Sequence, residues 1–161
     1  MRFVRAAMAA AALAASIVPA AADWQYTRWG MDPAQVKAAS GDVARDNPDR
    51  RLDAPGFTAD LVSPYEGATL PFTAVFLFDA ARKLGYVTLK PLGQIACPVI
   101  VEALVTNHGP PKGQVDLGHA TTMRWDDLDA DNLIVYSDLG QGNCTVQYSK
   151  LPPTRPNGKG L

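Results

Sequence analysis

Apolar and polar residues alternate along three stretches of the first half of the chain, and this pattern predicts β-strands over residues 56–62, 70–78 and 84–89. Every second residue of 70–78, counted from 70, is apolar, and these residues share one face of the predicted strand. The other face carries Thr73, Val75 and Leu77. Because both faces are apolar in its second half, we expect 70–78 to be a central strand. Residues 63–67 are predicted to form a turn, and the short connections favour an antiparallel meander.

The second half begins with a helical pattern and returns to strands. Apolar residues in 97–108 recur at the spacing of one helical face, Pro98 suits the first helical turn, and Gly109-Pro110-Pro111 would end the helix. A loop is predicted over 112–118. Three further strands are expected over 121–125, 132–137 and 143–151, with turns over 126–131 and 140–142.

A second helix is predicted near the start of the chain from residues that are typical of helix ends. Asp32 can serve as N-cap, Pro33 fits the first helical position, and Gln35 would complete a capping box. Gly41 supplies the residue that ends the helix. The preceding residues 24–29 alternate as a short strand would, and their aromatic side chains are interpreted as packing against this helix in preference to an exposed ligand platform.

The order helix, three strands, helix, three strands predicts an α+β fold in which an antiparallel sheet carries two short helices packed on one face. We expect one domain over 23–151. The tail over 152–161 holds prolines and glycines without an apolar pattern and is expected to be disordered.

The first 22 residues have the pattern of a secretory signal peptide. Arg2 and Arg5 precede an apolar run over 6–18, and the small residues up to Ala22 suit cleavage before Asp23. The run is too short for a membrane-spanning helix, and no lipid-attachment cysteine follows it. We therefore expect export to the periplasm, with no membrane span after removal of the signal.

Composition restricts the class of partner and the redox state of the two cysteines. The formal net charge of −1 and the scattered basic residues argue against nucleic acid as a partner. Cys97 and Cys144 are predicted to form a disulfide in an oxidising compartment. Free thiols or a redox pair are disfavoured because no C-x-x-C motif is present.

Motifs for chemistry are weak throughout the sequence. Four carboxylates have the spacing of a calcium loop, but the glycine and long glutamate of that loop are missing, so an acidic hairpin turn is the favoured interpretation; they are Asp127, Asp129, Asp131 and Asp138. His108, His119 and Asp116 are a still weaker zinc set. No nucleophile elbow and no nucleotide-binding motif occurs, so we assign no catalytic residue and no cofactor.

Arg50 and Arg51 lie in a polar connection, predicted over 42–55, that has no apolar period. They could bind an anion or a lipid headgroup. Solvation and neutralisation by neighbouring aspartates is the favoured interpretation.

The segment from Trp29 to Val36, together with Phe76-Leu77-Phe78-Asp79 and the region around Cys97, resembles uncharacterised small periplasmic proteins of proteobacteria. The layout is also similar to the α+β fold of outer-membrane-assembly lipoproteins and β-lactamase inhibitor proteins. This resemblance covers about 24–151 and implies a binding or scaffolding role. Without a lipid-attachment cysteine, it does not imply outer-membrane anchoring.

These features favour a periplasmic binding or interaction module of the cell envelope, which would bind another envelope protein or a small ligand. One alternative is a small periplasmic hydrolase or metal-dependent enzyme using Asp127, Asp129, His108 or His119. Another is a protein with a structural role in envelope maintenance.

Overall fold

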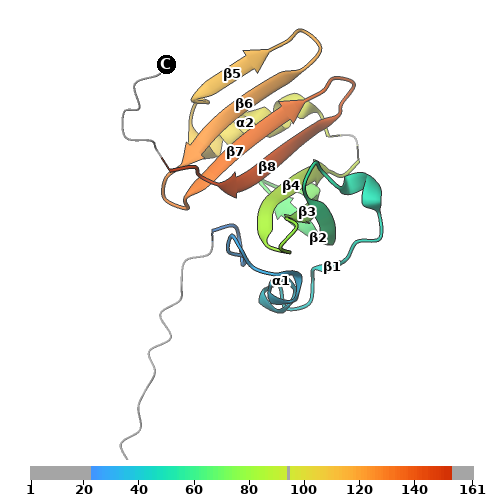
Figure 1. Cartoon of the computed structure of the whole chain (residues 1–161). Coiled ribbons are helices and arrows are strands. Elements are labelled where there is room, and N and C mark those ends of the chain that lie inside the picture. The colour runs from blue at the N-terminus through green and yellow to red at the C-terminus, as the bar shows by residue number, and fades with distance from the viewer. Residues whose placement is uncertain (1–22, 94, 154–161) are drawn as a thin grey trace, which may run out of the picture.

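The computed structural model describes residues 23–93 and 95–153 (Figure 1). The signal peptide predicted over 1–22 and the tail residues 154–161 lie outside them. The helices are α1 (Pro33–Ala39), α2 (Cys97–His108) and the 3₁₀ helix η1 (Arg50–Leu52). The strands are β1 (Arg45–Asp46), β2 (Thr58–Gly67), β3 (Leu70–Phe78), β4 (Leu84–Pro91), β5 (Gly113–Asp116), β6 (Thr121–Asp127), β7 (Asn132–Asp138) and β8 (Cys144–Lys150).

The eight strands form one antiparallel sheet with the order β1-β2-β3-β4-β8-β7-β6-β5. Each of the two α-helices precedes a group of four strands, and the last strands of the two groups, β4 and β8, pair at the centre of the sheet. Figure 1 shows α2 behind β6, β7 and β8, and α1 beside the β2–β4 end. The mixed α+β class is therefore confirmed. The predicted order of helix, three strands, helix, three strands was wrong by one strand in each group.

The two additional strands, β1 and β5, are the edge strands of the sheet. All their residues are exposed. Their side chains carry no buried face, so they lack the alternation by which strands are recognised in sequence. Backbone pairing, seen for Val62 with Arg45 and for Val115 with Thr122, places them in the sheet.

Strand β2 continues to Gly67 through the residues predicted as a turn. Its first half lies between β1 and β3, but β1 pairs only with Leu61 and Val62. Beyond Val62 the outer edge of β2 is free of a described neighbour strand. Pro64, which lacks an N–H group, is tolerated there because an edge position needs no donor on that side.

Alternation along the strands divides the sheet into two faces. Both helices pack on one face, where Val36 of α1 and Ile100 of α2 join a single core cluster with Phe76, Trp125 and Ile134. On the other face, η1 and Phe57 cover a smaller cluster built on β2–β4. Within residues 23–93 and 95–153 no helix covers the outer face of β7 and β8, and Leu133 and Val135 are half-buried there.

The first helix has the ends that the sequence predicted. The Asp32 carboxylate accepts a hydrogen bond from the Gln35 backbone N–H at 2.9 Å, and the Gln35 side chain accepts one from the Asp32 N–H at 2.9 Å. The preceding segment is a turn and not the expected strand, because the Thr27 N–H donates to the Trp24 carbonyl at 2.8 Å and Gln25 has a φ of 49°.

Helix α2 is joined covalently to the sheet. Cys97 at its first turn forms a disulfide with Cys144 at the start of β8, and the two Cα atoms are 5.9 Å apart. The predicted bridge is thus confirmed. None of the helices within residues 23–93 and 95–153 is long and apolar enough to span a membrane.

Candidate functional site

A cavity of about 360 Å³ opens between α2, the tip of the β2–β3 hairpin, the β6–β7 turn and the first described residues. We call it the α2 cavity. Its floor belongs to the main core and consists of Phe72, Leu89, Ile100, Leu104 and Val146. The volume and the apolar floor are those of a small-molecule site of modest size.

Aromatic rings form one wall of the α2 cavity. The Trp24 ring centroid lies 5.3 Å from that of Tyr65 and 6.1 Å from that of Tyr148. Gly67 is needed for this arrangement, because a Cβ atom at that position would lie 2.8 Å from the Tyr65 ring. The wall therefore combines apolar ring faces with two hydroxyl groups.

Polar side chains from separate elements surround the apolar floor. Asn107 and His108 come from the last turn of α2, Asp127 ends β6, Asn132 begins β7, and Gln25 lies in the N-terminal turn. His108 is exposed and Asp127 is half-buried. A few converging polar groups over an apolar floor are the usual means by which a pocket orients a ligand.

The tyrosine hydroxyls of this wall are held in their neutral form. Burial raises the pKa of Tyr148 far above its ordinary value, and the neighbouring Tyr65 and Asp127 raise it further. Burial also raises the pKa of Tyr65. At neutral pH both groups can therefore donate and accept hydrogen bonds, but neither can supply a negative charge.

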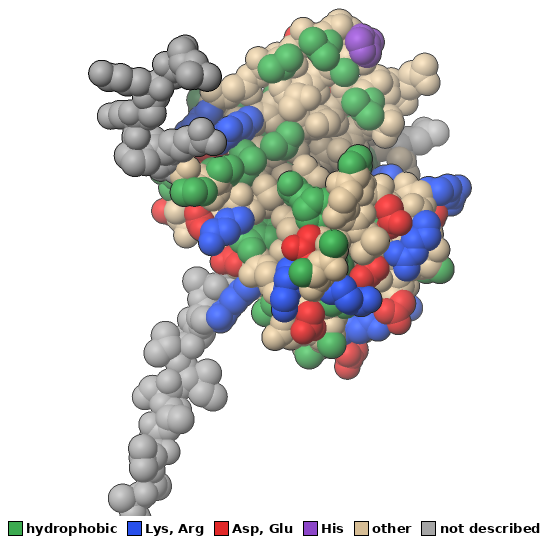
Figure 2. Space-filling view, viewed as in Figure 1, with side chains coloured by type: hydrophobic (Ala, Val, Ile, Leu, Met, Phe, Trp, Pro, Cys, Tyr) green, Lys and Arg blue, Asp and Glu red, His purple; other side chains and the backbone are tan. Residues whose placement is uncertain are grey.

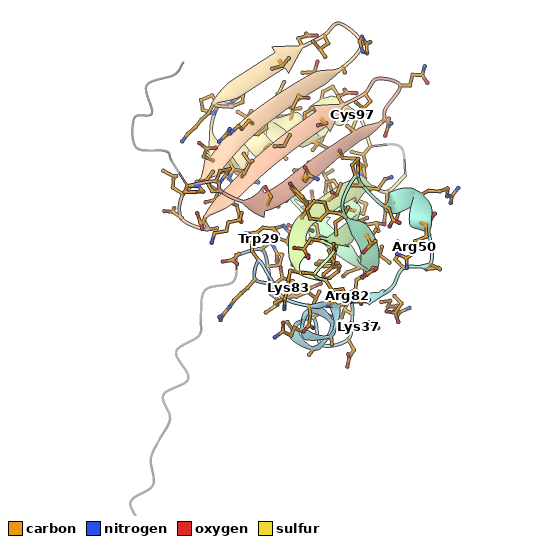
Figure 3. The ribbon with its side chains drawn as sticks, in the orientation of Figure 1. Trp29, Lys37, Arg50, Arg82, Lys83 and Cys97 are labelled. Carbon is orange, nitrogen blue, oxygen red and sulfur yellow. A yellow bond between two sulfur atoms is a disulfide. The ribbon has the colours of Figure 1, made fainter. Side chains whose placement is uncertain are left out.

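Asn132 holds the N-terminal segment against the sheet beside the cavity. Its side-chain oxygen accepts from the Trp29 indole N–H at 3.0 Å, and its amide donates to the Asp23 carbonyl. The Asp23 carboxylate in turn accepts from the Trp29 backbone N–H at 2.6 Å. Figure 3 shows Trp29 next to the ends of β7 and β8. This set of bonds, which we call the Asn132 clamp, fixes the segment that carries Trp24 and Gln25.

The mouth of the cavity contains unusual backbone conformations. Ala68 and Thr69 form the two-residue β2–β3 turn with φ values of 50° and 62°, and Gln25 also has a positive φ. Two-residue hairpin turns of this kind favour Asn-Gly, and a β-branched residue with positive φ is strained. Strain of this kind is often kept at binding sites.

The structure separates the residues of the predicted calcium loop. Asp127 and Asp138 lie at opposite ends of the β6–β7 hairpin, since Asp127 pairs with Asn132 and Asp138 pairs with Thr121. The Asp127 carboxylate instead accepts from the Ala130 N–H at 3.2 Å. Asp138 likewise accepts from the Gly140 N–H at 2.8 Å.

No group of three or more His, Cys, Asp or Glu side chains suited to a metal ion occurs within residues 23–93 and 95–153. The structure thus does not bring the calcium set together, including Asp129 and Asp131. The same holds for the zinc set: His108 ends α2, and His119 lies in the β5–β6 turn. Asp116 accepts from the Gly118 N–H at 2.7 Å.

Charged side chains gather around the β1–β4 end of the molecule, as Figure 2 shows for its visible face. Arg50 lies 3.3 Å from the Asp60 carboxylate and 3.7 Å from that of Asp53. Arg51 pairs with Asp49 at 2.8 Å. These contacts agree with neutralisation of the two arginines by neighbouring aspartates.

A second, shallower groove of about 410 Å³ lies on the outer face of the sheet. Its residues come from β4, β7 and β8, with Phe57 and Pro152 at its margins. The Phe57 ring packs against Tyr86 at a centroid distance of 4.6 Å. This groove lies open on the sheet surface and lacks the enclosed floor of the α2 cavity.

The sequence indicated some members of the cavity but not the cavity itself. His108 and Asp127 were candidates for enzyme chemistry, and the structure places both in its lining. Tyr65, Asn107 and Tyr148 were missed. They lie on β2, α2 and β8, and only the fold brings these elements together. Tyr65 was assigned to a turn, which hid its position on an inward-facing strand.

Comparison with known proteins adds little to this description. No family model matches the sequence, and no curated protein matches it. One solved structure is similar, a DUF4309 family protein (YjgB) from Bacillus subtilis, with 13% sequence identity and a TM-score of 0.44. The similarity covers 74% of this chain and 78% of that chain. At this level it supports no functional statement.

Proposed function

We propose that the protein is an exported binding module of the cell envelope that takes a small, largely apolar ligand into the α2 cavity. The observation that carries this proposal is the cavity itself, with its core-derived floor, aromatic wall and polar margin. The signal-like N-terminus supports export to the periplasm. The Cys97–Cys144 disulfide is compatible with that oxidising compartment.

A neutral apolar fluorophore such as N-phenyl-1-naphthylamine tests the proposal. Ala103 lies in the lining on α2, whereas Val105 on the same helix is 39% exposed and outside it. We expect Ala103→Phe to fill the cavity and abolish the fluorescence increase, and Val105→Phe to leave it unchanged. Equal binding by both variants, or no binding by the wild-type protein, would overturn the proposal.

A small hydrolase is the second candidate, because His108 and Asp127 line the same cavity. In that case His108 would activate a water molecule as general base, and Asp127 would orient it. The lining contains no Ser, Thr or Cys side chain among the described residues, so a covalent intermediate on these residue types is disfavoured. A chromogenic ester screen distinguishes the two functions: turnover lost in His108→Ala supports the hydrolase, and ligand retention without turnover supports the binding module.

A further inference from the structure

Among the described residues that line the α2 cavity, the permanently charged side chain is a carboxylate. Asp127 is the acidic residue of the lining, and neither lysine nor arginine occurs in the lining formed by residues 23–93 and 95–153. His108 is exposed, and its place at the last turn of α2 puts it at the margin. An anionic ligand would therefore approach a carboxylate without a permanent positive charge to balance it.

Asp127 differs in its ion pairing from Asp126, its neighbour in the chain. Asp126, on the other face of β6, lies 2.9 Å from the Arg124 guanidinium and 3.6 Å from the Lys112 ammonium. Asp127 makes no ion pair with the described residues, and its hydrogen bond comes from the Ala130 backbone N–H. One face of β6 thus presents a neutralised carboxylate, and the cavity face presents one available for a ligand.

The aromatic wall favours the same kind of ligand. Trp24, Tyr65 and Tyr148 lie close together beside the cavity. Faces of such rings attract cations through their quadrupole, most strongly where water is excluded. Tyr148 and Asp127 both line the cavity, so this wall and the carboxylate belong to one site.

We infer that the ligand of the α2 cavity is a primary amine with an apolar body, whose ammonium group pairs with Asp127 beside the aromatic wall while the body lies on the floor of Phe72, Ile100 and Leu104. This inference rests on the proposed function and specifies its ligand class. An ammonium group satisfies the carboxylate through charge-assisted hydrogen bonds. A neutral ligand of the same shape supplies no positive charge to balance it.

Three probes with one body separate these possibilities: 4-phenylbutylamine, 4-phenylbutanol and 4-phenylbutyrate. Their affinities for the full chain are measured by calorimetry at neutral pH and low salt. We expect the amine to bind at least about tenfold more tightly than the alcohol, which is a typical gain from one charge-assisted pair. We expect the carboxylate probe to bind most weakly.

Two variants test the role of the carboxylate. Asp127→Asn should lower the affinity for the amine about tenfold and leave the alcohol unchanged. Asp129→Asn is the matched control, because Asp129 is exposed in the same turn and outside the lining, and it should change neither affinity. The wild-type probe series decides the question even if Asp127→Asn fails to fold.

The outcomes separate the inference from the proposed function. If the alcohol binds as tightly as the amine, or if Asp127→Asn weakens both equally, the amine inference is overturned and the cavity remains a binding site. If none of the three probes binds the wild-type protein, both the inference and the proposed function are overturned.

Discussion

Replacement of Asn132 by alanine is expected to destabilise the whole domain, although it removes only one small polar side chain. Asn132 is 3% exposed and holds two groups of the N-terminal segment, the Trp29 indole N–H and the Asp23 carbonyl. Alanine can neither accept the first hydrogen bond nor donate the second. Both partners would then lose their bonds in a partly buried environment.

The magnitude follows from these two bonds. A typical intramolecular hydrogen bond contributes about 1 kcal/mol net, and a buried partner left unsatisfied costs about 1 kcal/mol or more in addition. The Asn132→Ala variant should therefore lose about 2–4 kcal/mol of unfolding free energy. Small domains have about 5–15 kcal/mol in total, so the loss is large.

Urea unfolding followed by tryptophan fluorescence measures this loss. The control is Asn143→Ala, since Asn143 is exposed in the β7–β8 turn and contributes there through its backbone N–H, which donates to Gly140 at 3.0 Å. We expect it to change the free energy by less than about 0.5 kcal/mol, as surface substitutions usually do.

Trp29→Phe separates the two bonds, because it removes the indole donor and leaves the Asp23 contact in place. In a double-mutant cycle, Trp29→Phe and Asn132→Ala should show a coupling energy of about 1 kcal/mol. If Asn132→Ala is as mild as Asn143→Ala, or if the cycle shows no coupling, the Asn132 clamp does not stabilise the fold as argued.

Three further variants address other features. The double variant Cys97→Ala/Cys144→Ala should lose about 4 kcal/mol of unfolding free energy, because the disulfide closes a loop between positions 47 apart. A thiol titration of native wild-type protein should detect no reactive thiol, and two reactive thiols would contradict the bridge. Replacing the β2–β3 turn by Ala68→Asn/Thr69→Gly should raise the unfolding free energy by about 1–2 kcal/mol in urea denaturation, since both positions have positive φ, and a decrease would argue against strain there. Burial, together with Asp138, raises the pKa of Tyr136 from its ordinary value of 10 to about 12, so the stability that this shift provides is fully present below pH 10 and is lost as pH rises towards 12. The urea midpoint of the wild-type protein should therefore fall over that range, and that of Tyr136→Phe should fall less.

Sequence patterns predicted those elements whose side chains have a buried face. Burial alternates along β7, the second half of β3 is buried on both faces, and α1 is specified by a local capping box that needs no tertiary contact. β1 and β5 could not be found in this way because their residues are exposed. Their position depends on backbone pairing, which the identity of the side chains does not report.

The cavity was beyond sequence reasoning for a different reason. Its aromatic wall joins Trp24, Tyr65 and Tyr148, which are far apart in the chain and belong to no common motif. From the sequence, Asp127 was a member of an acidic turn and a candidate for metal-dependent or hydrolytic chemistry, with no indication that it lines a cavity. Its contrast with Asp126 became visible once the two faces of β6 were known.

The pairing of β4 with β8 has a consequence for the order of folding. β8 is the last strand of the described chain, yet it occupies the centre of the sheet and supplies the only strand connection between the β1–β4 group and the β5–β7 group within the described residues. During synthesis, which starts at the N-terminus, the chain can form the β2–β4 meander early. The two strand groups cannot pair into one sheet until Val146 of β8 pairs with Leu89 of β4. Such contacts between distant positions slow folding. The incomplete chain would therefore stay open until almost all of it is available, and truncation before β8 should leave a partly folded species that chaperones and proteases recognise.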